Sequence, residues 1–167
     1  MKNITKVVLG IATVAYGIEL VREMKSVGAS LKDLKTHGEI VSGTYTGERK
    51  TWTVNDITVI GVYSPVSVLA SGALYASCNF DAYGHVVVVY DKNFTQLTEE
   101  EQYAVICHEA GHVHYQHDWR VRKLENEVQA DAYAAAVVGR ETMLSTLKKL
   151  STRCKKDKEL VARINAM

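Results

Sequence analysis

One stretch decides how this chain folds: residues 98–117 read TEEEQYAVICHEAGHVHYQH. Thr98 followed by Glu101 is the pattern of a capping box, and the acidic first turn complements the helix dipole. We therefore expect a helix from Thr98 to about the end of this stretch. Four-residue spacing places His108 and His112 on one face of that helix, one turn apart, so both imidazoles can reach a single ion.

Glu109 completes a His-Glu-x-x-His pattern on the same helix. Zinc in a catalytic site takes three protein ligands and keeps a fourth position for water. Glu109 lies beside the histidine face, where it can accept a proton from that water as a general base. Gly111 costs about 1 kcal/mol of helix propensity relative to alanine, which predicts that another segment approaches closely there. Cys107 faces about 100° away from His108 and is expected in the core.

A second helix, expected over about 121–138 and closed by Gly139, can supply the third ligand. Glu127 and Asp131 lie four residues apart and therefore on one face of it. Glu127 can complete the zinc site, and Asp131 can accept the second N–H of a ligand histidine. A solvated acidic face is the alternative interpretation of this pair. Small side chains around the pair permit close helix packing: Ala130, Ala132, Ala134, Ala135 and Ala136.

Upstream of the first helix the pattern is that of strands. Two β-branched runs, 51–54 and 57–60, flank an Asn-Asp connection and indicate a tight hairpin. Residues 85–90, with four consecutive valines, form the clearest strand, and 39–45 alternate as a strand would. Residues 64–83 are ambiguous, because small residues are mixed with scattered apolar ones.

After the second helix, two shorter helices are expected near 141–150 and 156–166. Strands followed by helices within 167 residues, the length of one domain, predict an α+β fold. The formal charge of +1 gives no reason to expect a nucleic-acid partner. Basic residues do gather near the C-terminus, but no aromatic platform accompanies them, so we interpret them as solvated helix faces.

The cysteines and the N-terminus bear on location. Cys78, Cys107 and Cys154 are an odd number without a Cys-x-x-Cys pair, which favours free thiols in a reducing compartment and a cytoplasmic protein. Apolar residues recur at helical spacing over residues 1–22 and predict an amphipathic helix that packs or lies on a surface. A signal peptide or a membrane anchor, and hence an exported or membrane-associated protein, are the alternatives.

The two motifs together resemble a known family. His108-Glu109-Ala110-Gly111-His112 and Glu127-Val128-Gln129-Ala130-Asp131 are similar to the paired HExxH and ExxAD motifs of HtpX-like and CAAX prenyl protease-like gluzincin peptidases. The resemblance extends from about Ser64 to the C-terminus and includes the valine-rich strand, His117 and the closing Arg163-Ile164. It implies one zinc ion held by His108, His112 and Glu127, with Glu109 as the base and Asp131 behind a ligand.

The resemblance also implies an architecture. We expect an amphipathic helix over residues 1–27 and a zincin-like metallopeptidase domain over residues 28–167. That α+β domain should contain a small, mostly antiparallel sheet with an edge strand before the active-site helix, then a helical C-terminal part. A peptide or unfolded protein substrate would pair with the strand at 85–90. Tyr133, His114 and His117 are candidate donors to the transition state.

Other interpretations remain open at this point. The zinc site could serve a catalytically silent protein-binding module, or a protease of narrow specificity that cleaves a regulator. A metzincin would use Asp118 as third ligand, but Tyr115 occupies the position where that class needs a glycine turn. A deformylase-like site would use an upstream cysteine such as Cys78, whose surroundings lack the motif of that family.

Overall fold

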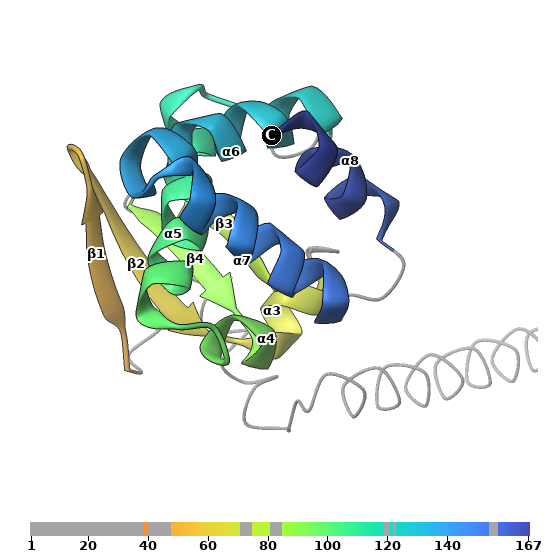
Figure 1. Cartoon of the computed structure of the whole chain (residues 1–167). Coiled ribbons are helices and arrows are strands. Elements are labelled where there is room, and N and C mark those ends of the chain that lie inside the picture. The colour runs from red at the N-terminus through yellow and green to blue at the C-terminus, as the bar shows by residue number, and fades with distance from the viewer. Residues whose placement is uncertain are drawn as a thin grey trace, which may run out of the picture.

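The computed structural model describes residues 39, 48–70, 75–80, 85–118, 121, 123–153 and 157–167. The expected N-terminal helix, Cys154 and all but Glu39 of the expected strand over 39–45 lie outside these residues, and Glu39 itself is helical. The described elements follow the order β1 Lys50–Val54, β2 Ile57–Tyr63, α3 Pro65–Ala70, β3 Ala76–Phe80, β4 Val86–Tyr90, α4 Lys92–Thr95, α5 Glu99–His114, α6 Leu124–Val138, α7 Arg140–Arg153 and α8 Lys158–Ala166. Strands thus precede packed helices, and the α+β prediction is confirmed (Figure 1).

The four strands form one sheet in the order β1-β2-β4-β3. The predicted hairpin is present: β1 pairs antiparallel with β2, and Asn55 in the connection takes a left-handed φ of 52°. β3 also pairs antiparallel with β4, while β2 and β4 are parallel, with Val59 opposite Val86. The sheet is therefore mostly antiparallel and fits a zincin-like fold.

The strand expected to pair with substrate is not at the edge of the sheet. β4 lies between β2 and β3, so both of its edges are already paired. Its four valines are all buried, between 0 and 8% exposed, which is the pattern of a strand covered on both faces. The two edge strands are β1 and β3, and β3 comes from the stretch that the sequence left ambiguous. The prediction for residues 85–90 was wrong in this respect.

Helix α5 is the centre of the structure. It contacts every strand of the sheet as well as α6 and α7 (Figure 1). The predicted capping box is present, since the Thr98 hydroxyl accepts from the backbone N–H of Glu101 and the Glu101 carboxylate accepts from that of Thr98. Residues 104–111 of α5 are all buried, and Cys107 is 0% exposed in the core, as predicted. The largest fully buried side chains come from α5 itself and from helices that precede and follow it in the sequence: Phe94, Ile106, Met143, Leu147, Leu150 and Leu160.

Gly111 is where α5 and α6 come closest. A Cβ at this position would lie 3.0 Å from the Ala130 Cα and 3.1 Å from the Tyr133 Cβ. Both distances are tighter than ordinary contacts, so the glycine permits the approach that its cost in helix propensity predicted. The consequence is that α6 presents its Glu127 face directly to the histidines of α5.

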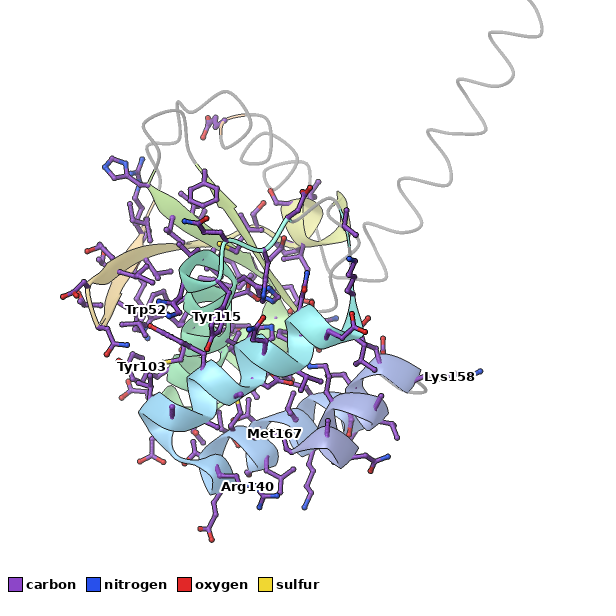
Figure 2. All side chains as sticks on the ribbon, turned by 90° about the horizontal axis from the view of Figure 1, so that it is seen from above. Trp52, Tyr103, Tyr115, Arg140, Lys158 and Met167 are labelled. Carbon is purple, nitrogen blue, oxygen red and sulfur yellow. The ribbon has the colours of Figure 1, made fainter. Side chains whose placement is uncertain are left out.

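Polar contacts join α5 to the β1–β2 hairpin and α7 to the C-terminal end of α8. The Tyr103 hydroxyl donates to the Thr53 carbonyl at 3.1 Å and joins α5 to the hairpin, where Trp52 packs edge-to-face on Phe94. At the other end Arg140 donates to the carbonyl of Met167, which closes α7 against α8 (Figure 2 labels both). Among the described residues, no helix is long and apolar enough to cross a membrane.

Candidate metal centre

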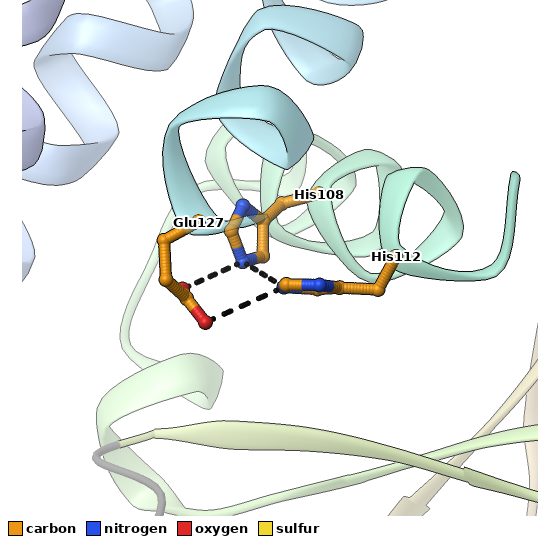
Figure 3. Close-up of side chains that lie close together, drawn as sticks. All are labelled: His108, His112 and Glu127. Carbon is orange, nitrogen blue, oxygen red and sulfur yellow. Dashed lines mark hydrogen bonds and ion pairs between the residues drawn. The ribbon is translucent and has the colours of Figure 1, made fainter. Parts of the chain in front are cut away.

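Three side chains from α5 and α6 converge on one point. His108 Nε2 lies 3.0 Å from His112 Nε2 and 3.4 Å from a Glu127 oxygen, and His112 Nε2 lies 3.6 Å from the other oxygen (Figure 3). Each residue offers one ligand atom to this group, which can hold a metal ion. The structure thus brings together the three side chains that the sequence selected. They come from two motifs whose first residues, His108 and Glu127, are nineteen positions apart.

Asp131 lies behind His108, where the sequence placed it. His108 Nδ1 donates to an Asp131 oxygen at 2.8 Å, and the carboxylate is fully buried. Arg163 of α8 completes this side of the site, with Nε and Nη2 donating to the two Asp131 oxygens at 2.8 and 2.7 Å. Its Nη1 donates to Glu127 at 2.9 Å. One buried guanidinium therefore holds the two buried acidic residues of α6, Glu127 and Asp131.

Arg163 is the residue that sequence reasoning missed. It is 3% exposed and lies 32 residues after Asp131, so no local spacing connects the two. The one available signal was the similarity of Arg163-Ile164 to the closing segment of the resembled family. Arginine is the cation expected in a buried ion pair, because its planar guanidinium can bind a carboxylate through two hydrogen bonds.

The charges of this cluster shift the protonation of its members. Burial alone would raise the pKa of the Glu127 and Asp131 carboxyls, but the charges and hydrogen bonds of His108 and Arg163 hold both below their usual range. For His108, burial and Arg163 lower the pKa, and the hydrogen-bonded carboxylates overcome them and raise it to about 9. Burial and the neighbouring His108 charge lower the pKa of His112 to about 3. With the two Nε2 atoms so close, only one ring of the pair, that of His108, carries a positive charge at neutral pH.

His112 is held by a different set of groups. Its Nδ1 lies 2.9 Å from His117 Nδ1, and His117 Nε2 lies 2.9 Å from the Gln129 side-chain oxygen. Gln129 is an uncharged amide and comes from the same helix as Glu127. The sequence had marked His117 as a helix-end residue or a transition-state donor and did not connect it to His112.

Glu109 lies next to the ligand group without being part of it. Its side chain is buried, and its carboxylate accepts a hydrogen bond from the backbone N–H of Cys78 on the edge strand β3. Burial raises the pKa of Glu109 above its usual range, and Glu127 adds to this, while His108 and Arg163 oppose it. The carboxylate thus lies between the histidine face of α5 and the edge of the sheet.

A pocket of about 260 Å³ opens beside His112. Residues of β3, of the C-terminal end of α5 and of the turn that follows it line the pocket: Cys78, Phe80, His112, Val113, Gln116 and His117. Phe80 is 58% exposed, so it presents an apolar ring at the edge of the sheet. The pocket and the ligand group share the His112 ring, which places the pocket next to the metal centre.

Two of the expected donor residues are engaged elsewhere. The Tyr133 hydroxyl accepts a hydrogen bond of 2.8 Å from the Asn55 amide in the hairpin connection. The exposed His114 ring packs on Tyr115 and Tyr133, with centroid distances of 4.9 Å to each. Neither residue belongs to the group that can hold a metal, and in the described part of the chain Cys78 and Asp118 do not belong to it either.

Comparison with known proteins agrees with this site. Residues 63–124 match the model of peptidase family M48, so this part of the chain is similar to that family. The match begins at the end of β2 and includes the whole of α5 with His108, Glu109 and His112; it ends three residues before Glu127. The resemblance predicted from the two motifs is thereby confirmed. No curated protein and no solved structure matches the chain.

Proposed function

We propose that this protein is a zinc-dependent endopeptidase with its metal on His108, His112 and Glu127. The spacing of the donor atoms carries the proposal. A tetrahedral zinc ion with ligands at about 2.1 Å requires donor atoms about 3.4 Å apart, and the three observed separations are 3.0, 3.4 and 3.6 Å. Two imidazoles and one carboxylate are the ligand set of a catalytic zinc, whereas calcium takes six to eight oxygen ligands.

Glu109 is the proposed general base. Bound zinc would polarise the scissile carbonyl and lower the pKa of a coordinated water to about 7. Glu109 accepts a proton from the attacking water and later delivers it to the leaving amine. A carboxyl whose pKa is raised by burial suits this role, because it must hold the proton between the two steps.

The substrate is proposed to be a peptide or an unfolded protein bound along β3. An extended chain can add to a sheet edge through main-chain hydrogen bonds, and β3 is the edge strand beside the site. The hydrogen bond from the Cys78 backbone to Glu109 supports this, because it ties the proposed base to the same edge. A substrate side chain would enter the adjoining pocket, where Phe80 and Val113 favour an apolar group.

The donor that stabilises the transition state remains a prediction. Tyr133 would have to leave its hydrogen bond with Asn55, and His114 its aromatic contacts, before either could reach a substrate. His117 lines the pocket, but both of its ring nitrogens already have partners.

The buried position of Glu109 at the sheet edge supports the catalytic function over its alternative. A catalytically silent zinc-binding module has no use for Glu109 in that place, while a protease of narrow specificity would use the same site. The proposed function therefore includes both broad and narrow proteases, and the structure favours either over a binding module.

The test compares zinc-loaded wild type with the Glu109→Gln variant on a reduced, alkylated unfolded protein. We expect the wild type to cleave it and the variant to lose about 10²- to 10⁴-fold in turnover, the usual contribution of a general base, while retaining one zinc per chain. Full turnover by the variant would contradict the mechanism. One bound zinc without cleavage of any member of a peptide library by the wild type would overturn the function in favour of the binding module.

A further inference from the structure

The two proposed ligand histidines are held through the same atom by unlike partners. His108 Nδ1 meets the buried Asp131 carboxylate, whereas His112 Nδ1 meets the ring of another histidine, His117. Ligand histidines almost always use the ring nitrogen remote from the metal for a hydrogen bond that fixes the tautomer and the ring orientation. His117 is thus placed where such a partner for His112 belongs.

The end of α5 is shaped to bring His117 back onto His112. Gln116, just beyond the helix, has a φ of 55°, which reverses the chain direction as at a left-handed helix end. The backbone N–H of His117 then donates to the His112 carbonyl at 3.0 Å. His117 is therefore bonded to His112 through the backbone and the side chain together, which leaves its ring little freedom.

Gln129 sets the direction of this chain of hydrogen bonds. Its side-chain oxygen can only accept, so His117 Nε2 must carry the hydrogen in the 2.9 Å contact. In the neutral ring the lone pair is then on His117 Nδ1, which accepts from His112 Nδ1–H. His112 consequently directs the lone pair of Nε2 toward His108 and Glu127, as a metal ligand must.

We infer that His117 is a positioning residue that orients the metal ligand His112, with Gln129 fixing the tautomer of His117. The inference rests on the proposed metal site. It assigns two tasks to α6, which supplies one ligand directly through Glu127 and supports another through Gln129 two residues later.

The test measures cobalt(II) binding by the full chain, through affinity in competition with a chelator and through the visible absorption spectrum. We expect His117→Ala to weaken binding about 10- to 100-fold, as is usual for such outer partners, and to change the spectrum. Gln129→Leu, which keeps the His117 ring, should weaken binding less and change the spectrum in the same direction. His117→Gln, which can still accept from His112, should restore part of the affinity.

His114→Ala is the matched control. Its ring lies in the last turn of α5, as that of His112 does, but it contacts Tyr115 and Tyr133. It should bind cobalt as the wild type does. Wild-type affinity and spectrum in both His117→Ala and Gln129→Leu would overturn the inference; if His117→Ala does not fold, the result for Gln129→Leu decides. Failure of the wild type to bind any cobalt would instead overturn the metal site itself, so the two failures are distinguishable.

Discussion

The two sides of the candidate metal centre orient their histidines by different physical means. On the His108 side, Asp131 and Arg163 form a buried charged cluster, and the His108 side chain is 3% exposed. On the His112 side, the side chain is 20% exposed, and its partners are a histidine ring and an amide. Buried charges are costly to leave unpaired, whereas neutral groups near solvent can exchange partners with water. We therefore expect the first side to control the stability of the fold and the second to control the metal alone.

The largest effect should come from breaking the charged side. Arg163→Met leaves two buried carboxylates without their cation, so we expect a loss of about 3–5 kcal/mol in the free energy of unfolding. Urea denaturation of the metal-free protein measures it. Arg140→Met is the control, because Arg140 is exposed at the start of α7 and donates to the Met167 carbonyl, away from the two carboxylates. Equal stability of the two variants would remove the distinction between the two sides.

A smaller effect should follow from separating α5 and α6 at Gly111, where the two helices come closest. Gly111→Ala gains about 1 kcal/mol of helix propensity but introduces a Cβ at 3.0 Å from the Ala130 Cα, a backbone atom that cannot rotate away. Overpacking of this kind costs about 1–3 kcal/mol, so we expect net destabilisation and weaker metal binding together.

Thermal unfolding and metal titration check this prediction. Ala132→Ser, on the exposed face of the same α6, is the control and should change neither quantity by a measurable amount. A stabilised Gly111→Ala variant with unchanged metal affinity would show that α5 and α6 do not need the close approach.

The smallest effect should come from a charged pair remote from the metal, Glu101 and Lys149, which meet at 2.6 Å. Burial raises the pKa of Glu101, but Lys149 and the Thr98 backbone outweigh it and lower it below the usual value. A lowered folded-state pKa means that this stabilisation is present at neutral pH and is lost as the pH falls below about 4.5, toward the folded pKa. Because Lys149 is 36% exposed, Glu101→Gln should cost about 1 kcal/mol or less.

Denaturation at pH 7 and at pH 3 measures the difference between wild type and Glu101→Gln. The difference should be present at pH 7 and smaller at pH 3. A smaller loss of stability in Glu101→Gln than in Arg163→Met would show that an ion pair contributes most to stability when it is fully buried. A difference that grows in acid would contradict the assigned direction of the pKa shift.

Local signals in the sequence predicted the parts of the fold that depend on neighbouring residues. The Thr98 capping box, the Asn-Asp hairpin and the glycine after α6 each act within a few residues, and all three are present. The two histidines of the group that can hold a metal were predictable for the same reason, since four-residue spacing fixes a helix face. Glu127 followed from a second motif of the same kind on the next helix.

The features that sequence reasoning missed all depend on contacts between distant segments. The parallel pairing of β2 with β4 moves β4 into the sheet, and no local pattern identifies β3, whose Ala-Ser-Cys-Asn-Phe sequence has no β-branched residue. Arg163 reaches Asp131 only after α8 has packed on α6. The link from His112 through His117 to Gln129 likewise requires the chain to turn back between α5 and α6.

The most direct test of the central claim is the zinc content of the dialysed protein with Glu127 intact and replaced. We expect one zinc per chain in the wild type and in the control Glu125→Gln, whose side chain is exposed on the same helix. Glu127→Gln should lose the metal under the same dialysis, because it replaces an anionic ligand of the proposed site by a neutral amide. Full retention of zinc by Glu127→Gln would contradict the account, since the metal would then not depend on the third member of the group.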